Sequence, residues 1–312
     1  MSPTVIVFGP TGNAGSITAH TAHSHGAKVI LAMRDPSKSI PGLTQDQEQQ
    51  GGYSRVQADL TKPESLTAAV KTSGATRAFI YLTHASSDHM RSSLEALKAA
   101  GIEFVVFLSS FSIAADGGGE PRNVPQHEII SYRHAQVEIN LDEVFGPEHY
   151  VALRVGGFAT NLLRYKDGVA KGEVSLHGGG YMMDFITPGD MGGAGGTILA
   201  TQTGPRGGQG KVDLFGPQRL SLVDAIGVIG RVLGREVKIS GISDEEAVER
   251  YAAGHMPRPL AEYMVRKWGG KQDMEREWPE YEEGVENVKR YTGKPAMRLE
   301  EWIEANKEAF GG

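Results

Sequence analysis

Short apolar runs alternate with segments of helical spacing over the first half of the chain. The runs are rich in β-branched residues and lie at 4–8, 28–33, 54–58, 77–82, 103–108 and 150–154. Runs of this length, bounded by Gly, Pro and polar residues, are typical of strands buried on both faces of a sheet. Helical spacing is found at 63–72, 87–100 and about 127–144. This alternation predicts an α/β fold with a doubly wound parallel sheet.

Beyond residue 155 the alternation weakens. Short strands are predicted at 174–176, 183–186, 212–215 and 237–239, and helices at 189–200, 221–233, 244–252 and 299–310. The helix at 189–200 consists of small residues, so it could pack closely on the sheet. The helix at 221–233 has one apolar face and Ser221 as its N-cap. We therefore expect a Rossmann-type domain over 1–155 and a smaller α/β substrate-binding region over 156–312, with 188–233 packing back on the sheet.

Composition narrows the possible partners. The chain has 312 residues, a net charge of −6 and no cysteine. The absence of cysteine excludes thiol nucleophiles and thiolate metal sites, and the lack of a basic run argues against direct nucleic-acid binding. No apolar run approaches the ~20 residues of a membrane span. Residues 1–8 already have a strand pattern, so we expect no leader, a cytoplasmic location, and a monomer or homodimer.

Three glycines follow the first predicted strand. Gly9, Gly12 and Gly15 are spaced by three residues, and helical spacing begins after them. Glycines let backbone N–H groups approach phosphate oxygens, and a helix N-terminus adds free donors and partial positive charge. The spacing is G-x-x-G-x-x-G rather than G-x-G-x-x-G. It is met in the short-chain dehydrogenase superfamily, but an ordinary strand–helix turn is the alternative.

The end of the second predicted strand distinguishes between dinucleotides. An acidic residue at this position would bind the ribose 2′-hydroxyl of NAD. Here the strand is followed by Arg34, with Lys38 just beyond. A guanidinium suits a 2′-phosphate through a forked contact, which favours NADPH. A solvated loop arginine is the alternative interpretation.

Two further strand ends leave alternatives open. Asp59 could accept a hydrogen bond from the adenine amino group, or could cap the helix that begins at Pro63. The segment 112–126 is rich in Gly, Pro and Asp. It could line a substrate cleft or be a plain surface connection.

Several motifs together resemble the NmrA-like branch of the atypical short-chain dehydrogenase/reductases. They are GPTGNAG at 9–15, MRDPSK at 33–38, ADLTKPESL at 58–66, LSS at 108–110, HAQVEINL at 134–141, LRVGGFATN at 153–161 and YTGKPAMRLEEWIEAN at 291–306. The resemblance implies an NAD(P)-binding Rossmann domain. Members of the family are NADPH-dependent reductases of small molecules, or redox-sensing regulators that bind the cofactor without turnover. By position, the resemblance implies cofactor contacts at Gly9, Thr11, Gly12, Asn13, Ala14, Gly15, Arg34, Lys38, Asp59, Leu60, Leu82, Thr83, Ser109, Gly157 and Phe158.

The proton-donating Tyr/Lys pair of the superfamily is incomplete. Anchoring the pattern on Ala135 and Glu138 puts His134 at the Lys position and Ile130 at the Tyr position. Reduction of a ketone needs a proton donor, whereas an iminium ion or an activated alkene makes a weaker demand. The catalytic candidates are His134, Tyr132 and Ser110. His134 could donate a proton or hydrogen-bond the ribose, or could simply be a structural histidine.

Substrate contacts are expected at Phe111, Asn161, Met256 and Trp268. The segment 255–281, rich in Met, Trp and Tyr, could form a wall over a flat substrate, although a core role is favoured. The spacing of His20, His23 and His25 resembles a metal motif, but no carboxylate is placed nearby and we expect no metal.

Three functions are compatible with these residues. The leading hypothesis is a reductase that uses NADPH/NADP⁺ and transfers hydride to a small organic substrate with an imine or iminium, activated alkene or carbonyl group. The alternatives are an NADP(H)-sensing regulator with a protein partner, and a non-redox isomerase or cyclase.

Overall fold

The computed structural model describes residues 2–202, 210–254, 256–269, 278 and 280–311. The chain forms two compact units. The first comprises Met1–Val155, Pro188–Leu214 and Tyr281–Pro295, and the second comprises Gly156–Thr187, Phe215–Glu280 and Ala296–Gly312. The expected return of 188–233 to the first unit therefore extends only to Leu214, and residues 215–233 belong to the second unit.

A seven-stranded parallel sheet forms the centre of the first unit. Its strands lie in the order β3-β2-β1-β4-β5-β6-β9. Each neighbouring pair is parallel. The first six strands follow the doubly wound order, which confirms the predicted fold class. The strands are β1 (Thr4–Phe8), β2 (Lys28–Met33), β3 (Ser54–Gln57), β4 (Arg77–Tyr81), β5 (Phe104–Ser110), β6 (Tyr150–Val155) and β9 (Lys211–Leu214).

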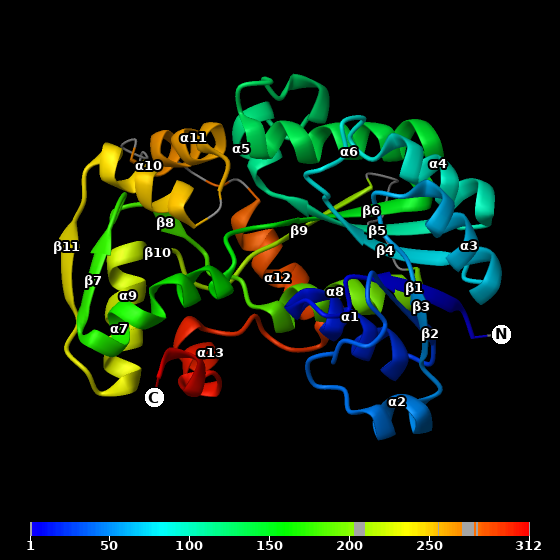
Figure 1. Ribbon diagram of the computed structural model, residues 1–312, viewed down its shortest axis with the longest axis horizontal. Coiled ribbons are helices and arrows are strands. Elements are labelled where there is room, and N and C mark those ends of the chain that lie inside the picture. Colours follow the sequence, from blue (N-terminus) through cyan, green and yellow to red (C-terminus); the bar gives the residue numbers. More distant parts are fainter. Residues whose placement is uncertain (1, 203–209, 255, 270–277, 279, 312) are drawn as a thin grey trace. The chain divides into compact units, whose positions relative to one another are not determined.

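Helices cover both faces of this sheet (Figure 1). On one face lie α3 (Pro63–Ser73), α4 (Arg91–Ala100) and α6 (Ile129–Phe145), and on the other lie α1 (Asn13–Ser24) and α8 (Pro188–Thr201). The α3–α4–α6 side encloses a core that includes Ile80, Leu94, Phe107 and Leu141. Burial of each such side chain contributes about 1.5–3 kcal/mol to the stability of the fold. The sheet therefore holds the residues at its strand ends in fixed positions.

Close packing of α8 against α1 depends on glycine. A Cβ at Gly192 would lie 2.7 Å from the carbonyl oxygen of Ala14 and from Cβ of Ile17. A Cβ at Gly196 would lie 2.6 Å from the carbonyl oxygen of Thr18. The small residues of α8 therefore allow its backbone to approach α1, in addition to the predicted contact with the sheet.

Several elements differ from the predictions. The helix expected from residue 87 begins at Arg91, because His89 and Met90 have positive φ angles of 51° and 67°. The segment 112–126, expected to be a loop, contains α5 (Ser112–Gly117) and the 3-10 turn η1 (Pro121–Asn123). Four further helices were not predicted: α2 (Gln45–Gly51), α7 (Lys166–Lys171), α11 (Arg258–Gly269) and α12 (Tyr281–Thr292). A further 3-10 turn, η2 (Pro147–His149), precedes β6.

The second unit has two small sheets and its own core. β7 (Glu173–Leu176) pairs in parallel with β11 (Lys238–Gly241), and β8 (Met182–Met183) pairs antiparallel with β10 (Leu220–Ser221). The predicted N-cap is confirmed, because Oγ of Ser221 accepts a hydrogen bond from the Asp224 N–H (3.0 Å). The helical elements are η3 (Ala159–Tyr165), α7 (Lys166–Lys171), α9 (Leu222–Leu233), α10 (Asp244–Ala253), α11 (Arg258–Gly269), α13 (Leu299–Ala305) and η4 (Lys307–Phe310).

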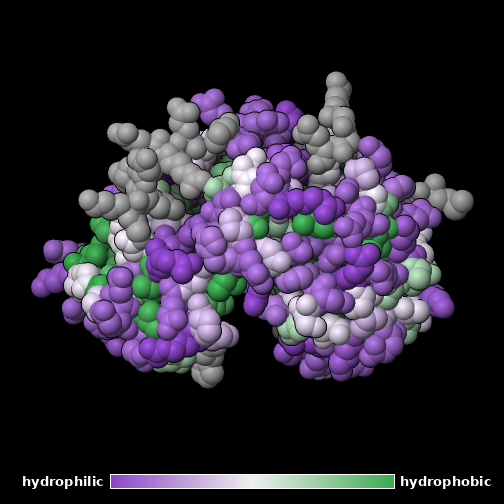
Figure 2. Space-filling view, turned by 90° about the horizontal axis from the view of Figure 1, so that it is seen from above, coloured by the Kyte–Doolittle hydropathy of each residue, from purple (hydrophilic) through white to green (hydrophobic). Residues whose placement is uncertain are grey.

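The visible surface is largely hydrophilic, with smaller hydrophobic patches (Figure 2). Within the described ranges, the large hydrophobic residues that are exposed are Tyr81, Val223 and Met297. A search of the same residues finds no helix with both the length and the apolarity that a membrane span requires.

Candidate functional site

The glycine turn between β1 and α1 is tightly constrained. Gly9 has a φ of +70°, and the N–H of Gly12 donates to the carbonyl oxygen of Gly9 (3.0 Å). A Cβ at Gly15 would overlap that oxygen and lie 2.8 Å from the Gly9 carbonyl carbon. α1 has no side-chain N-cap and no acidic residue in its first turn. Its first N–H groups are therefore available to an anion.

A cavity of about 330 Å³ opens at the carboxyl ends of β1 to β4. Seven residues predicted from the sequence contribute to its lining, from four successive strand ends. They are Gly9, Thr11, Arg34, Asp59, Leu60, Leu82 and Thr83. The other residues of the lining are Phe8, Ala32, Met33, Ala58, Thr61, Tyr81, His84 and Ala85. This is the crevice in which ligands of doubly wound sheets bind.

Arg34 supplies positive charge to this cavity. Its side chain is exposed, and its guanidinium has no hydrogen bond or ion pair to any residue that the structure describes. Its carbonyl oxygen accepts a hydrogen bond from Nε2 of Gln57 (3.0 Å), which fixes the backbone at this strand end. Lys38 is also exposed but is not part of the lining. An unpaired guanidinium at this position is suited to a phosphate.

Asp59 does not cap the following helix. Its Oδ1 accepts hydrogen bonds from the N–H of Thr61 (2.9 Å) and from Oγ1 of Thr61 (2.8 Å). The N-cap of α3 is Lys62, without a side-chain capping bond. The capping alternative was therefore wrong. The Thr61 backbone N–H is the main cause of a lowered Asp59 pKa, so the carboxylate stays ionised and can accept a further donor.

Three side chains of β4 and its end shape the cavity. The Tyr81 ring lies over the glycine turn, because a Cβ at Gly9 would be 2.6 Å from its Cε1. Oγ1 of Thr83 is buried and has no hydrogen-bond partner among the described residues. Nδ1 of His84 accepts from Nη1 of Arg133 (3.1 Å). Sequence reasoning missed Tyr81 and His84. An aromatic residue at the end of a predicted strand was the available signal for Tyr81.

The two serines that end β5 face different partners. Ser109 is buried, and its hydroxyl donates to Oε1 of Glu138 (2.5 Å), so that hydroxyl is already used inside the protein. Oγ of Ser110 lies 2.8 Å from Oγ of Ser112 and accepts from the Ser112 N–H (3.2 Å). Successive strand residues point to opposite faces. The Ser110 hydroxyl, unlike that of Ser109, therefore forms no hydrogen bond with Glu138.

His134 is held in one tautomer. Its Nδ1 lies 2.8 Å from the carbonyl oxygen of Ile130, which can only accept, so Nδ1 carries the proton and Nε2 has a lone pair. Burial lowers the His134 pKa, so the ring is neutral at pH 7. Tyr132 packs against the apolar side chains of Ile113 and Val124. It also lies edge-on to His89, with ring centroids 5.7 Å apart.

The remaining predicted substrate residues are distributed over both units. Phe111, in the first unit, donates its N–H to the carbonyl oxygen of Val155 (3.0 Å). In the second unit, Asn161 and Trp268 both line a small aromatic cavity, together with Tyr181. Met256 is not in that lining. Of the predicted wall at 255–281, residues 255, 270–277 and 279 lie outside the described residues.

The second unit holds Gly157 through a buried carboxylate. Oδ1 of Asp184 accepts from the N–H of Gly157 (2.6 Å), and Oδ2 accepts from the N–H of Gly216 (2.8 Å). A Cβ at Gly156 would overlap the same carboxylate. Asp184 therefore fixes the backbone at Gly156 and Gly157. The next residue, Phe158, forms a β-bridge with Ile186. Asp184 was not predicted.

Asp184 should make the stability of the protein depend on pH. Burial raises its pKa from 3.8 to about 7. Between these values the folded chain holds a proton that the unfolded chain has released, so stability falls as pH rises through this window. The shift corresponds to about 4 kcal/mol. We expect the unfolding free energy of Asp184→Asn, measured by urea titration, to fall less between pH 5 and 8 than that of the original protein. Parallel curves would contradict this assignment.

Of the three histidines with metal-like spacing, His20 and His23 both contact the Tyr53 ring, and His25 lies near Thr197. Nε2 of His23 donates to the carbonyl oxygen of Gly51 (2.7 Å), and its ring stacks on Tyr53. Nε2 of His25 lies 3.1 Å from Oγ1 of Thr197. No group of three or more His, Asp or Glu residues suited to a metal ion was found in the described part of the chain.

Comparison with known proteins supports the sequence resemblance. The profile of the NmrA-like family matches residues 1–303. The chain belongs to the NmrA-like family. Within the family, it is 36% identical to a nitrogen metabolite regulation-like protein of Gibberella fujikuroi over 318 residues, which cover 96% of this chain and 95% of that protein.

Two other proteins share similarity over nearly the full length. An NAD(P)H azoreductase of Xenophilus azovorans is 25% identical, with 98% of this chain and 99% of that protein covered. The crystal structure of an NADPH-dependent quinone oxidoreductase of Escherichia coli complexed with NADPH superposes with a TM-score of 0.73 at 18% identity. It covers 97% of this chain and 100% of that chain. At this identity, the similarity to the quinone oxidoreductase shows that the two chains share a fold.

Proposed function

We propose that this NmrA-like protein binds NADPH in the cavity at the carboxyl ends of β1 to β4. The observation that carries the proposal is the unpaired Arg34 guanidinium at a cavity that also includes the glycine turn. Gly9 and the free N–H groups of α1 would hold the diphosphate. Asp59 and the unpartnered hydroxyl of Thr83 would contact the adenosine half. NADPH supplies a hydride when bound.

We further propose that the protein is a reductase of small organic molecules. The azoreductase relative supports this class of chemistry. The neutral His134, with a lone pair on Nε2, would accept a hydrogen bond from the nicotinamide ribose rather than donate a proton. Ser110 would assist at the reacting end. Because the Tyr/Lys pair is incomplete at positions 130 and 134 of α6, acceptors that need little protonation, such as an iminium ion or an activated alkene, fit better than a simple ketone.

Replacing Arg34 with alanine should reduce the preference for NADPH over NADH. A charge-assisted contact to a 2′-phosphate contributes about 1.5–3 kcal/mol, so we expect NADPH to bind about ten- to a hundredfold more weakly. NADH affinity should change little. Titration calorimetry of both nucleotides checks this, with Lys71→Ala on the far part of α3 as a matched surface control. An unchanged ratio of the two affinities would remove the 2′-phosphate assignment.

Hydride transfer can be tested directly with deuterated cofactor. The protein should oxidise (4-²H)NADPH in the presence of an azo dye, a quinone or a cyclic iminium salt. The amine formed from the iminium salt should contain a C–D bond, whereas deuterium delivered to nitrogen or oxygen exchanges with water and those acceptors are followed by the oxidation of NADPH. Mass spectrometry of the products checks this, and His134→Ala should raise the KM for NADPH more than it lowers kcat. Binding of NADPH without its oxidation by any acceptor of the panel would contradict the reductase proposal.

A regulator that senses NADP(H) is the second candidate function. It is favoured by the regulation-like relative, which is 36% identical over 96% of this chain. It is also favoured by the absence of a lysine at position 134 and of a tyrosine at position 130. In this case NADPH and NADP⁺ should differ in affinity while no acceptor is reduced, which calorimetry with both redox forms would show.

A further inference from the structure

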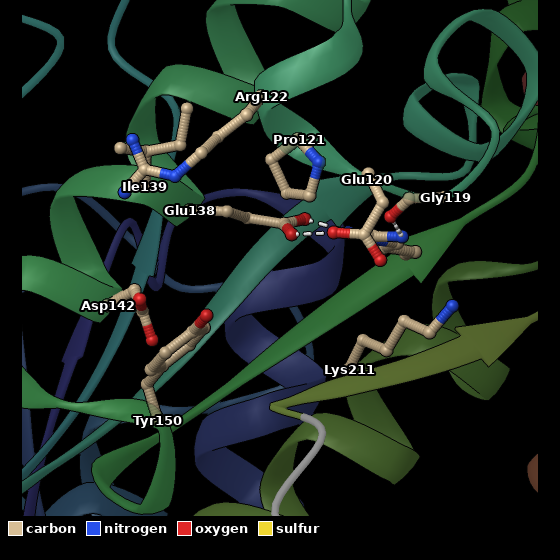
Figure 3. A pocket seen from close by; sticks show the side chains of 10 residues that line it. Gly119, Glu120, Pro121, Arg122, Glu138, Ile139, Asp142, Tyr150 and Lys211 are labelled. Atoms are coloured by element: carbon tan, nitrogen blue, oxygen red, sulfur yellow. Dashed lines mark hydrogen bonds and ion pairs between the residues drawn. The ribbon is translucent and has the colours of Figure 1, made fainter.

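A second cavity of about 350 Å³ lies at the other end of the strand order. Its floor is formed by β6 and the edge strand β9, and its walls are formed by α6 and the segment 119–122 (Figure 3). None of its lining residues belongs to the cavity at β1 to β4. It therefore cannot be part of the proposed adenosine site.

A buried ion pair closes the base of this cavity. The side chains of Arg154 and Glu138 are each 3% exposed, with Nη2 and Oε2 2.7 Å apart. Nε of Arg154 also donates to Oε1 of Glu138 (3.1 Å), and Nη1 donates to the carbonyl oxygen of Gly119 (2.8 Å). The two charges neutralise each other, so the pair shapes the cavity but does not set the charge of a ligand.

Four polar side chains around the opening have no partner among the described residues. The ammonium group of Lys211, the phenol of Tyr150 and the carboxylates of Glu120 and Asp142 form no hydrogen bond or ion pair with any residue in the described ranges. Tyr150 is only 9% exposed. Its ring is packed in the protein while its hydroxyl lines the cavity without a partner among the described residues, so the hydroxyl is held in place for a ligand. This is the observation that points to a ligand.

The signs of the free charges restrict the ligand. Lys211 and Glu120 lie on one side of the cavity, and Asp142 lies with Tyr150 on the other (Figure 3). Arg122 is already engaged with Glu143 (3.3 Å). A dianion would meet Glu120 and Asp142, and a dication would meet Lys211. Unpaired or like charges in a pocket select strongly against such ligands.

We propose that this cavity binds a small zwitterion, a molecule with one ammonium and one carboxylate group. The ligand carboxylate pairs with Lys211, and the Tyr150 hydroxyl, on the side of Asp142, accepts a hydrogen bond from the ligand ammonium. The ligand ammonium pairs with Asp142. Charge-assisted bonds of this kind are the strongest polar contacts available to a small ligand. This binding is independent of the proposed NADPH chemistry.

Three four-carbon compounds with different end groups test the proposal. The full chain, without nucleotide, is titrated by calorimetry with γ-aminobutyrate, succinate and putrescine. We expect γ-aminobutyrate to bind and the other two to show no heat of binding. Glycine and ε-aminocaproate extend the series, so that a zwitterion of different length is also detected. Failure of all three zwitterions, or equal binding of succinate or putrescine, would overturn the proposal.

Variants of the free charges give a second measurement. Lys211→Met and Asp142→Asn should each weaken zwitterion binding about tenfold or more, and Tyr150→Phe should weaken it less. Lys71→Met, an exposed lysine of α3, is the matched control and should not change binding. Asp142 is exposed, so its variant should fold normally. Unchanged affinity in both Lys211→Met and Asp142→Asn would show that any observed zwitterion binding occurs at another site.

Discussion

Replacing Gly15 with alanine should weaken NADPH binding at least a hundredfold. The new Cβ would overlap the carbonyl oxygen of Gly9, which is backbone and cannot rotate away. Either the glycine turn or the start of α1 must shift. That shift would move the N–H groups that are proposed to hold the diphosphate. Close positioning decides the strength of such contacts, so we expect at least a hundredfold loss, about 3 kcal/mol. Titration calorimetry with NADPH measures it.

Gly12→Ala is the matched control for this substitution. Its φ of −91° suits any residue, and its Cβ would lie 3.4 Å from the carbonyl oxygen of Gly9, an ordinary contact. The thermal midpoint of Gly12→Ala should therefore stay close to that of the original protein, whereas Gly15→Ala should unfold at lower temperature. Normal NADPH affinity in a folded Gly15→Ala variant would show that the diphosphate binds elsewhere.

The strands of the first unit were predictable because their signal is local. Apolar runs such as 28–33 and 150–154 match β2 and β6 to within one residue, since a strand buried on both faces needs apolar residues throughout. Two of the missed helices, α2 and α12, carry no such apolar run. α2 is a polar helix that is defined by a capping box between Thr44 and Gln47. α12 buries only Gly284, Asn287 and Val288.

The residues of the candidate site were also predictable only where their signal is local. The glycine turn and Arg34 were found because glycine spacing and the residue after a strand are adjacent in sequence. Asp184 was missed because its partners, Gly157 and Gly216, lie 27 and 32 residues away. Ser109 was expected to contact the cofactor, yet its hydroxyl is bound by Glu138, which lies 29 residues further along. Pairings at such separations form only when distant elements pack together, as α6 packs on the sheet in the case of Ser109 and Glu138, and they leave no local pattern.

Removing one partner of the Arg154–Glu138 pair should cost about 3–5 kcal/mol of stability. Arg154→Met leaves the Glu138 carboxylate buried, with only Ser109 as a donor among the described residues. Glu138→Leu leaves the guanidinium with the Gly119 carbonyl oxygen and the nearby charge of Asp213. Urea unfolding of each variant measures the loss. The shift of the urea midpoint reports the loss, because the slope of the unfolding free energy against urea concentration should stay constant.

The double variant separates a buried charge from a lost contact. Arg154→Met together with Glu138→Leu removes both charges and fills the space with apolar atoms, so it should be more stable than either single variant. The exposed pair Arg250–Glu246, about half exposed on both sides, is the matched control. Arg250→Met should cost less than about 1 kcal/mol. If the two single losses simply add in the double variant, the pair is not coupled, and the base of the second cavity is held by packing rather than by its ion pair.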